Sequence, residues 1–260
     1  MNGIEPMQPF SPDFAAAEVA PSPNFGERRG IAAPDLLLLH YTGTKTAEEA
    51  LARLRDPASE VSSHYFVFED GRVVQLVPEA RRAWHAGASS WEGATDINSC
   101  SIGIEIVNPG HDFGYRDFPP KQIKAVIALC HDIVARHRIR ADRVLAHSDV
   151  APDRKQDPGE KFPWRQLHKA GVGHWVTPSR GGKGAALKMG DGGADVLALQ
   201  EELAAYGYGI TPSGEFDQVT ANVVAAFQRH FRPAHVDGIA DASTRITLQK
   251  LLVTRPTVAA

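Results

Sequence analysis

A continuous apolar run in the first fifth of the chain is the feature that most restricts its fold. Residues 35–41 read DLLLLHY, with four leucines in succession before His40. Successive side chains of a strand point to opposite faces, so an unbroken apolar run predicts a strand covered on both faces. A sheet with packed elements on either side indicates an α/β architecture.

A second strand is predicted by strict alternation over residues 101–107, SIGIEIV. The isoleucines occupy one face, and Ser101, Gly103 and Glu105 occupy the other, so one face packs and the other borders open space. Pro119-Pro120 then opens a long helix with apolar residues at i, i+3, i+4 and i+7, which should cover the sheet.

Two shorter patterns extend the predicted sheet. Residues 64–68 and 72–77 are β-rich runs on either side of Glu69-Asp70-Gly71, and they predict a hairpin. Residues 143–147 predict another strand, which ends at His147 and enters a proline-punctuated loop.

Changes in composition divide the chain into four segments. Proline-rich residues 1–20 predict an extended, weakly structured arm, and residues 21–176 hold the predicted sheet. Residues 177–193 are rich in glycine without periodicity, which is typical of a flexible linker. Residues 194–260 contain three helical patterns, which predict a small all-α domain.

Charge and hydropathy exclude several classes of protein. The net charge is -3, with 28 basic and 31 acidic residues, so no electrostatic surface for nucleic acid is indicated. No apolar run reaches the roughly 20 residues of a membrane span. The N-terminus shows no basic and apolar signal peptide, so the cytoplasm is the expected compartment, with the periplasm or cell envelope as the alternative. These patterns do not predict an oligomeric state.

The candidate chemistry depends on histidines and carboxylates, because two cysteines cannot form a thiolate cage. His40 and His147 end two predicted strands, and Asp157 follows ten residues after His147. Two imidazoles and one carboxylate suit an open zinc site, where the metal lowers the pKa of a bound water to about 7. Glu105, on the open face of its strand, is the candidate general acid and base.

Each of these residues also has an ordinary structural interpretation. A histidine at a strand end is more often a hydrogen-bonding residue than a ligand, and an aspartate before proline usually forms a turn. Spacing alone cannot show that distant residues converge, so these patterns by themselves support a metal hydrolase only weakly.

Six segments together carry a stronger indication. In chain order they are SPNFGERRG, LLLLHYTGT, VSSHYFVFEDGRVVQLV, AWHAGASSWEG, INSCSIGIEIVN and LAHSDVAPDRKQDPGEKFPW. They closely resemble the zinc-dependent N-acetylmuramoyl-L-alanine amidases of the type 2 family, over about residues 21–175. The resemblance implies a central mixed sheet flanked by helices, and hydrolysis of the amide that joins muramic acid to L-alanine of the peptide stem.

The resemblance also assigns residues. It places the zinc ligands at His40, His147 and Asp157 and the acid/base residue at Glu105. Lys155 takes the family's lysine position, where a cation beside zinc could stabilise an oxyanion; its alternative is a solvated loop lysine. Some relatives have cysteine where this chain has Asp157, so zinc remains the expected metal, with an affinity that is lower or more sensitive to pH.

Substrate contacts are expected in the loop between the hairpin and the strand at 101–107. Trp84, His85 and Asn98 lie there with Trp91, and aromatic and polar groups of this kind suit a ligand of sugar and peptide. The alternative is a loop anchored by tryptophan without a ligand. His64, near the site in relatives, is expected either to orient substrate or to pack.

The C-terminal patterns VLALQEELAAYGY, GEFDQVTANVVAAFQRHF and VDGIADASTRITLQKLL resemble a small helical peptidoglycan-binding domain. The expected partners are therefore peptidoglycan or muropeptide fragments, in cell-wall degradation or recycling. Two alternatives remain open: a peptidoglycan-recognition protein without catalysis, and a zinc peptidase that cuts within the stem peptide.

Overall fold

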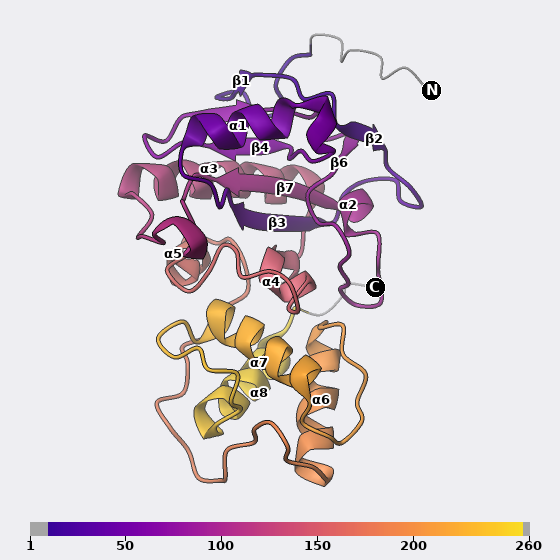
Figure 1. Cartoon of the computed structure of the whole chain (residues 1–260), viewed down its shortest axis with the longest axis vertical. Helices are drawn as coiled ribbons and strands as arrows, with labels where there is room; N and C mark the ends of the chain where they lie inside the picture. The colour runs from indigo at the N-terminus through magenta and orange to yellow at the C-terminus, as the bar shows by residue number, and fades with distance from the viewer. Residues whose placement is uncertain (1–9, 257–260) are drawn as a thin grey trace.

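A computed structural model describes residues 10–256, and it consists of a sheet domain followed by a helical domain (Figure 1). The strands are β1 (Glu18–Val19), β2 (Phe25–Glu27), β3 (Leu36–Tyr41), β4 (Tyr65–Val67), β5 (Val73–Gln75), β6 (Arg81–Ala83), β7 (Ser101–Ile106) and β8 (Val144–Ala146). The helices are α1 (Ala47–Arg55), α2 (Ile97–Cys100), α3 (Pro120–His137), α4 (His147–Val150), α5 (Trp164–Lys169), α6 (Ala194–Tyr206), α7 (Gln218–Phe231) and α8 (Ala242–Thr254). None of these helices is long and apolar enough to cross a membrane.

The central sheet is mixed, as the sequence predicts. Its order is β1-β5-β4-β7-β3-β8, with β4 and β5 antiparallel and the other neighbours parallel. The antiparallel pair is the predicted hairpin, and its turn contains Gly71 at φ 92°. A Cβ at Gly71 would lie 2.9 Å from the Lys121 carbonyl oxygen, so α3 begins too close to this turn for a side chain.

The apolar run of β3 is buried on both faces, which confirms the prediction. Leu37 and Leu39 join one core with Ile102 and Ile104 of β7 and the apolar stripe of α3. Leu36 and Leu38 belong to a second core, which continues into the helical domain. A third core lies between α1 and the hairpin, around Phe66 and Val74.

The N-terminal arm predicted at residues 1–20 is described only from residue 10, and residues 1–9 lie outside the described part. The described part is attached to the sheet. β1 pairs with β5, and the Asp13 carboxylate accepts hydrogen bonds from Gln75 Nε2 at 2.6 Å and Glu79 N at 2.9 Å. An extended segment is ordered here because the edge of the hairpin supplies backbone partners.

The helical domain contains the three predicted helices, α6, α7 and α8, and it packs against the sheet domain beside α4 (Figure 1). Trp91 is fully buried between the domains, with Tyr206 and Tyr208 around its ring. The segment predicted as a flexible linker, residues 177–193, is bonded to the helical domain: Ser179 N donates to Thr247 Oγ1, and Leu187 bridges Ala240.

Candidate metal centre and active-site cavity

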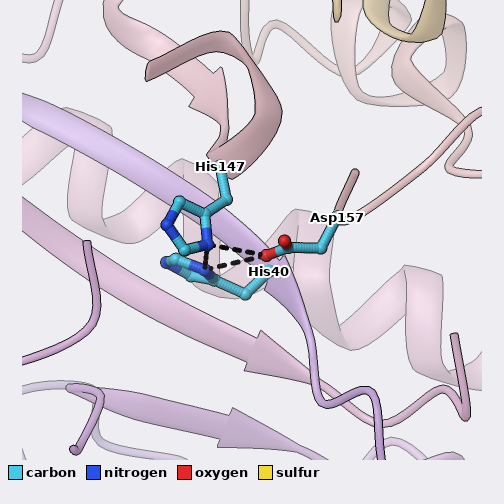
Figure 2. A group of neighbouring side chains, drawn as sticks. All are labelled: His40, His147 and Asp157. Atoms are coloured by element: carbon cyan, nitrogen blue, oxygen red, sulfur yellow. Dashed lines mark hydrogen bonds and ion pairs between the residues drawn. The ribbon is translucent and has the colours of Figure 1, made fainter. Parts of the chain in front are cut away.

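Three chain segments bring the predicted metal ligands together. His40 lies near the end of β3, His147 opens α4 directly after β8, and Asp157 follows in the loop (Figure 2). The two Nδ1 atoms are 2.9 Å apart, and each is 3.0 Å from Asp157 Oδ2. Because β3 and β8 are parallel neighbours, their carboxyl ends meet at one edge of the sheet.

The donor set fits a single metal ion. Tetrahedral zinc with bonds of about 2.0–2.1 Å separates its ligand atoms by about 3.3 Å, close to the triangle found here. Nε2 of His147 lies 3.1 Å from the Ala86 carbonyl oxygen, which can only accept. A neutral His147 therefore carries its proton on Nε2 and directs the lone pair of Nδ1 at a carboxylate oxygen, an arrangement that a cation would stabilise.

The charge states of these groups suit metal binding. Burial, and next the neighbouring His147, lower the pKa of His40 to about 4, so its imidazole is neutral at neutral pH. The site therefore presents the neutral His40 imidazole beside the carboxylate of Asp157.

Glu105 lies beside this triad. β3 and β7 pair in parallel with His40 opposite Glu105, so both side chains leave the sheet on the same face. Oε2 of Glu105 is buried without a hydrogen-bond partner among the described residues. Burial, and next the charge of Asp157, raise the pKa of Glu105 to about 8. This carboxyl group can hold a proton near neutral pH.

A cavity of about 320 Å³ opens over these groups. Its wall includes three other residues predicted from the sequence, Lys155, Trp84 and His85. Arg53 and Arg154 also line the cavity, and neither was predicted from the sequence as a site residue. A carboxyl group, a lysine and a metal-binding triad thus face one space large enough for a substrate group.

Two residues predicted to bind substrate are placed elsewhere. His64 is fully buried, accepts from Gly103 N through Nδ1 at 2.9 Å, and has Arg81 O at 3.0 Å from Nε2. Asn98 is buried too, and its Oδ1 accepts from the backbone of His85 and Ala86 at 2.9 and 2.8 Å. Neither is among the described residues that line the cavity. For His64 the structure favours packing; Asn98 holds the loop that borders the site.

The outer contacts of the two histidines were not predicted from the sequence. Nε2 of His40 lies 3.1 Å from Nδ1 of His85, and His147 contacts the Ala86 carbonyl. A backbone carbonyl leaves no signal in a sequence. His85 could be noticed in the sequence as a histidine near the predicted site. Its contact with His40 could not be predicted, because the two residues are 45 positions apart in the chain.

The mixed sheet, the convergent His/His/Asp set and the buried carboxyl in one cavity are compatible with a hydrolase that has a metal site. Comparison with known proteins makes the class specific. The family model for N-acetylmuramoyl-L-alanine amidase matches residues 31–160, and the model described as "Putative peptidoglycan binding domain" matches residues 192–248. The chain belongs to the N-acetylmuramoyl-L-alanine amidase family.

Individual relatives agree with this assignment. The chain is 42% identical over 229 residues to the N-acetylmuramoyl-L-alanine amidase AmiD of Escherichia coli. The aligned region covers 84% of this chain and 82% of that protein. The chain is 34% identical over 189 residues to the 1,6-anhydro-N-acetylmuramyl-L-alanine amidase AmpD of Citrobacter freundii, covering 64% of this chain and 93% of the relative.

Solved structures show the same fold. The complex of E. coli AmiD with anhydro-N-acetylmuramic acid-L-Ala-D-gamma-Glu-L-Lys matches with a TM-score of 0.74 at 38% identity, over 89% of this chain and 98% of that one. AmpDh3 of Pseudomonas aeruginosa matches with a TM-score of 0.72 at 29% identity, over 96% and 100% of the two chains. Both matches extend through the helical domain.

Proposed function

We propose that this amidase uses zinc to hydrolyse the amide between N-acetylmuramic acid and L-alanine in muropeptides or peptidoglycan. The observation that carries the proposal is the placement of Glu105, with an unpartnered buried oxygen, beside the His40/His147/Asp157 triad in one cavity. The solved complex of AmiD with an anhydromuropeptide supports the substrate class.

His40, His147 and Asp157 would hold the ion. Bound zinc would supply Lewis acidity and lower the pKa of a bound water to about 7. The His40 imidazole is already neutral at neutral pH, and the Asp157 carboxylate supplies negative charge that retains a divalent cation.

Glu105 would move the protons of the reaction. In its ionised form, Glu105 would accept a proton from the attacking water and return it to the nitrogen of the leaving L-alanine. Lys155 lines the same cavity and would place its ammonium group near the substrate carbonyl oxygen, where negative charge develops. Trp84 would supply an apolar wall for the sugar or the peptide.

The helical domain would bind the cell wall. Its match to a peptidoglycan-binding family supports this role, and a second attachment point would raise the local concentration of substrate at the cavity.

Product analysis tests the proposal. Purified protein is incubated with muropeptides after treatment with a chelator, and zinc is then restored to half of the sample. Mass spectrometry should show glycan without peptide and a stem with a free L-alanine amine only in the zinc-restored sample. Cleavage within the stem would indicate a peptidase, and binding without cleavage in both samples would indicate a recognition protein; either result would contradict the proposal.

A further inference from the structure

A chain of hydrogen bonds runs from a backbone carbonyl to the metal-ligand His40. Ser101 Oγ donates to Ile97 O at 2.6 Å, and Nε2 of His85 lies 3.2 Å from Ser101 Oγ. Nδ1 of His85 lies 3.1 Å from Nε2 of His40. All four residues are buried, so these contacts are largely shielded from water.

The carbonyl at one end sets the direction of every proton in this chain. The Ile97 oxygen only accepts, so the single proton of Ser101 Oγ is directed to it. Ser101 Oγ must then accept from His85, whose proton therefore sits on Nε2. A neutral His85 with Nε2 protonated has a bare Nδ1, and that atom accepts from Nε2 of His40. His40 is left with a bare Nδ1, which is the atom facing His147 and Asp157.

The sheet is shaped to hold the ring of His85. A Cβ at Gly103 would lie 2.5 Å from Cγ and Nδ1 of His85, so the ring rests directly on the backbone of β7. Asn98 Oδ1 holds the backbone of residues 85 and 86 from the other side. The ring meets His40 edge-on, with their centroids 5.1 Å apart. Close packing of the His85 ring therefore requires glycine at position 103, and the alternating pattern of the strand does not indicate this requirement.

The same loop orients the second histidine ligand. Residue 86 follows His85, and its carbonyl oxygen accepts from Nε2 of His147 at 3.1 Å. Two consecutive residues thus contact the outer nitrogens of both ligand histidines. Outer contacts of this kind fix the tautomer and the ring orientation of metal ligands, and their loss typically weakens metal affinity by about 10–100-fold.

We propose that His85 is a positioning residue: with Ser101 it holds His40 in the tautomer whose Nδ1 is free to bind the metal before the metal arrives. The proposal rests on the proposed metal function of His40. It differs from the sequence-based prediction that His85 contacts substrate, because here His85 acts through His40.

The tautomers can be observed directly in the metal-free protein. Histidine-ring ¹⁵N–¹H correlation spectra of the full-length chain, after removal of metal, should show His40, His85 and His147 each protonated on Nε2. In Ser101→Ala, the ring of His85 loses its acceptor, and the signals of His40 should shift toward a mixture of tautomers. A wild-type His40 protonated on Nδ1 would overturn the proposal.

Zinc affinity gives a second readout that is independent of catalysis. Competition of the full-length protein with a chelating dye should show zinc binding weakened about 10–100-fold in His85→Leu and about 10-fold in Ser101→Ala. His85→Asn should recover part of the loss, because its side-chain oxygen can accept in place of Nδ1. Equal affinities in wild type, His85→Leu and Ser101→Ala would refute the positioning role.

Ser99→Ala is the matched control. Ser99 is as buried as Ser101 and lies two residues away, but its hydroxyl contacts Asp96 Oδ2 and Arg29 N instead of the chain to His40. It should change stability without changing zinc affinity. If the wild type binds zinc with the expected tautomers but leaves muropeptides intact, the proposed function fails and the role of His85 stands.

Discussion

At the scale of single residues, Glu105 is the group whose surroundings differ most from those of an ordinary strand carboxylate. It lies opposite His40 in the sheet, and its Oε2 atom is buried without a partner among the described residues. Glu105→Gln should keep the shape and remove the proton transfer, so kcat on muropeptides should fall about 10²–10⁴-fold. Zinc affinity should stay close to that of the wild type. Unchanged turnover would show that another group transfers the proton.

The raised pKa of Glu105 also predicts a dependence of stability on pH. Its pKa is about 8 in the folded, metal-free protein against an ordinary 4.5, so the folded state binds the proton more tightly than the unfolded state. This contribution to stability is complete below about pH 4.5 and is lost as the pH rises through 8. The free energy of unfolding, measured with urea on metal-free protein, should therefore fall more between pH 5 and pH 9 for wild type than for Glu105→Gln. Parallel pH profiles would contradict the assigned environment.

The predictability of the site differed from residue to residue. The convergence of His40, His147 and Asp157 was expected from strand ends and motif context, and the geometry brings them together. The arrangement around His85 could not be derived in this way. Its hydrogen bonds go to His40 and Ser101, 45 and 16 residues away, and which nitrogen meets which partner depends on packing against Gly103.

At the scale of elements, the carboxylate of Glu79 joins the hairpin to the end of α3. Oε1 accepts from Tyr65 Oη at 2.6 Å and from Arg136 at 2.7 Å, and Oε2 lies 2.6 Å from His137 Nε2. The side chain is only 3% exposed. Burial raises its pKa, but these hydrogen bonds outweigh burial and lower the pKa of Glu79 to about 2.

The lowered pKa sets the direction of the pH effect. Because the folded pKa lies below the ordinary 4.5, the stabilisation is present above pH 4.5 and is lost as the pH falls toward 2. The contribution is on the order of 3 kcal/mol at pH 7. Glu79→Gln should lower the free energy of unfolding by about that amount at pH 7, with a smaller deficit at pH 3.5, measured by urea denaturation.

Glu69→Gln serves as the control for this experiment. Glu69 forms an ion pair with Arg116 in which both side chains are exposed to solvent. Such pairs contribute about 0–1 kcal/mol to the free energy of unfolding. A deficit of Glu79→Gln that stays constant from pH 7 to pH 3.5 would contradict the role of the ionised carboxylate.

The elements that could be predicted were those with a long or periodic pattern. The leucine run predicted β3, and strict alternation predicted β7. The apolar residues at helical spacing after Pro119 predicted α3. β1, β2 and β6 were not predicted, because their residues EV, FGE and RRA contain charged side chains or glycine and show no run of β-forming residues. They form only where a neighbouring backbone offers partners.

At the scale of the whole molecule, the two domains share buried polar contacts as well as an apolar core. Asp149, two residues after His147, is fully buried. It accepts from Tyr208 Oη at 2.8 Å and lies 2.7 Å from Nδ1 of His230, both in the helical domain. The ring of His230 stacks on Trp164, with centroids 3.7 Å apart. The glycine-rich composition before the helical domain gave no indication of this interface, because its contacts come from residues far apart in the chain.

This interface predicts that the domains unfold together. All four tryptophans precede residue 176, so tryptophan fluorescence reports on the sheet domain and, through Trp91 and Trp164, on the interface. Far-ultraviolet circular dichroism also reports on α6, α7 and α8. The two signals should show coincident urea transitions. Tyr208→Phe removes one donor from the buried Asp149 carboxylate, which should cost about 1–3 kcal/mol and shift both transitions equally. His235→Ala, in an exposed pair with Asp237, should shift neither. Separate transitions for the two probes would mean that the contacts around Asp149 do not couple the domains, and that the helical domain acts as an independent attachment.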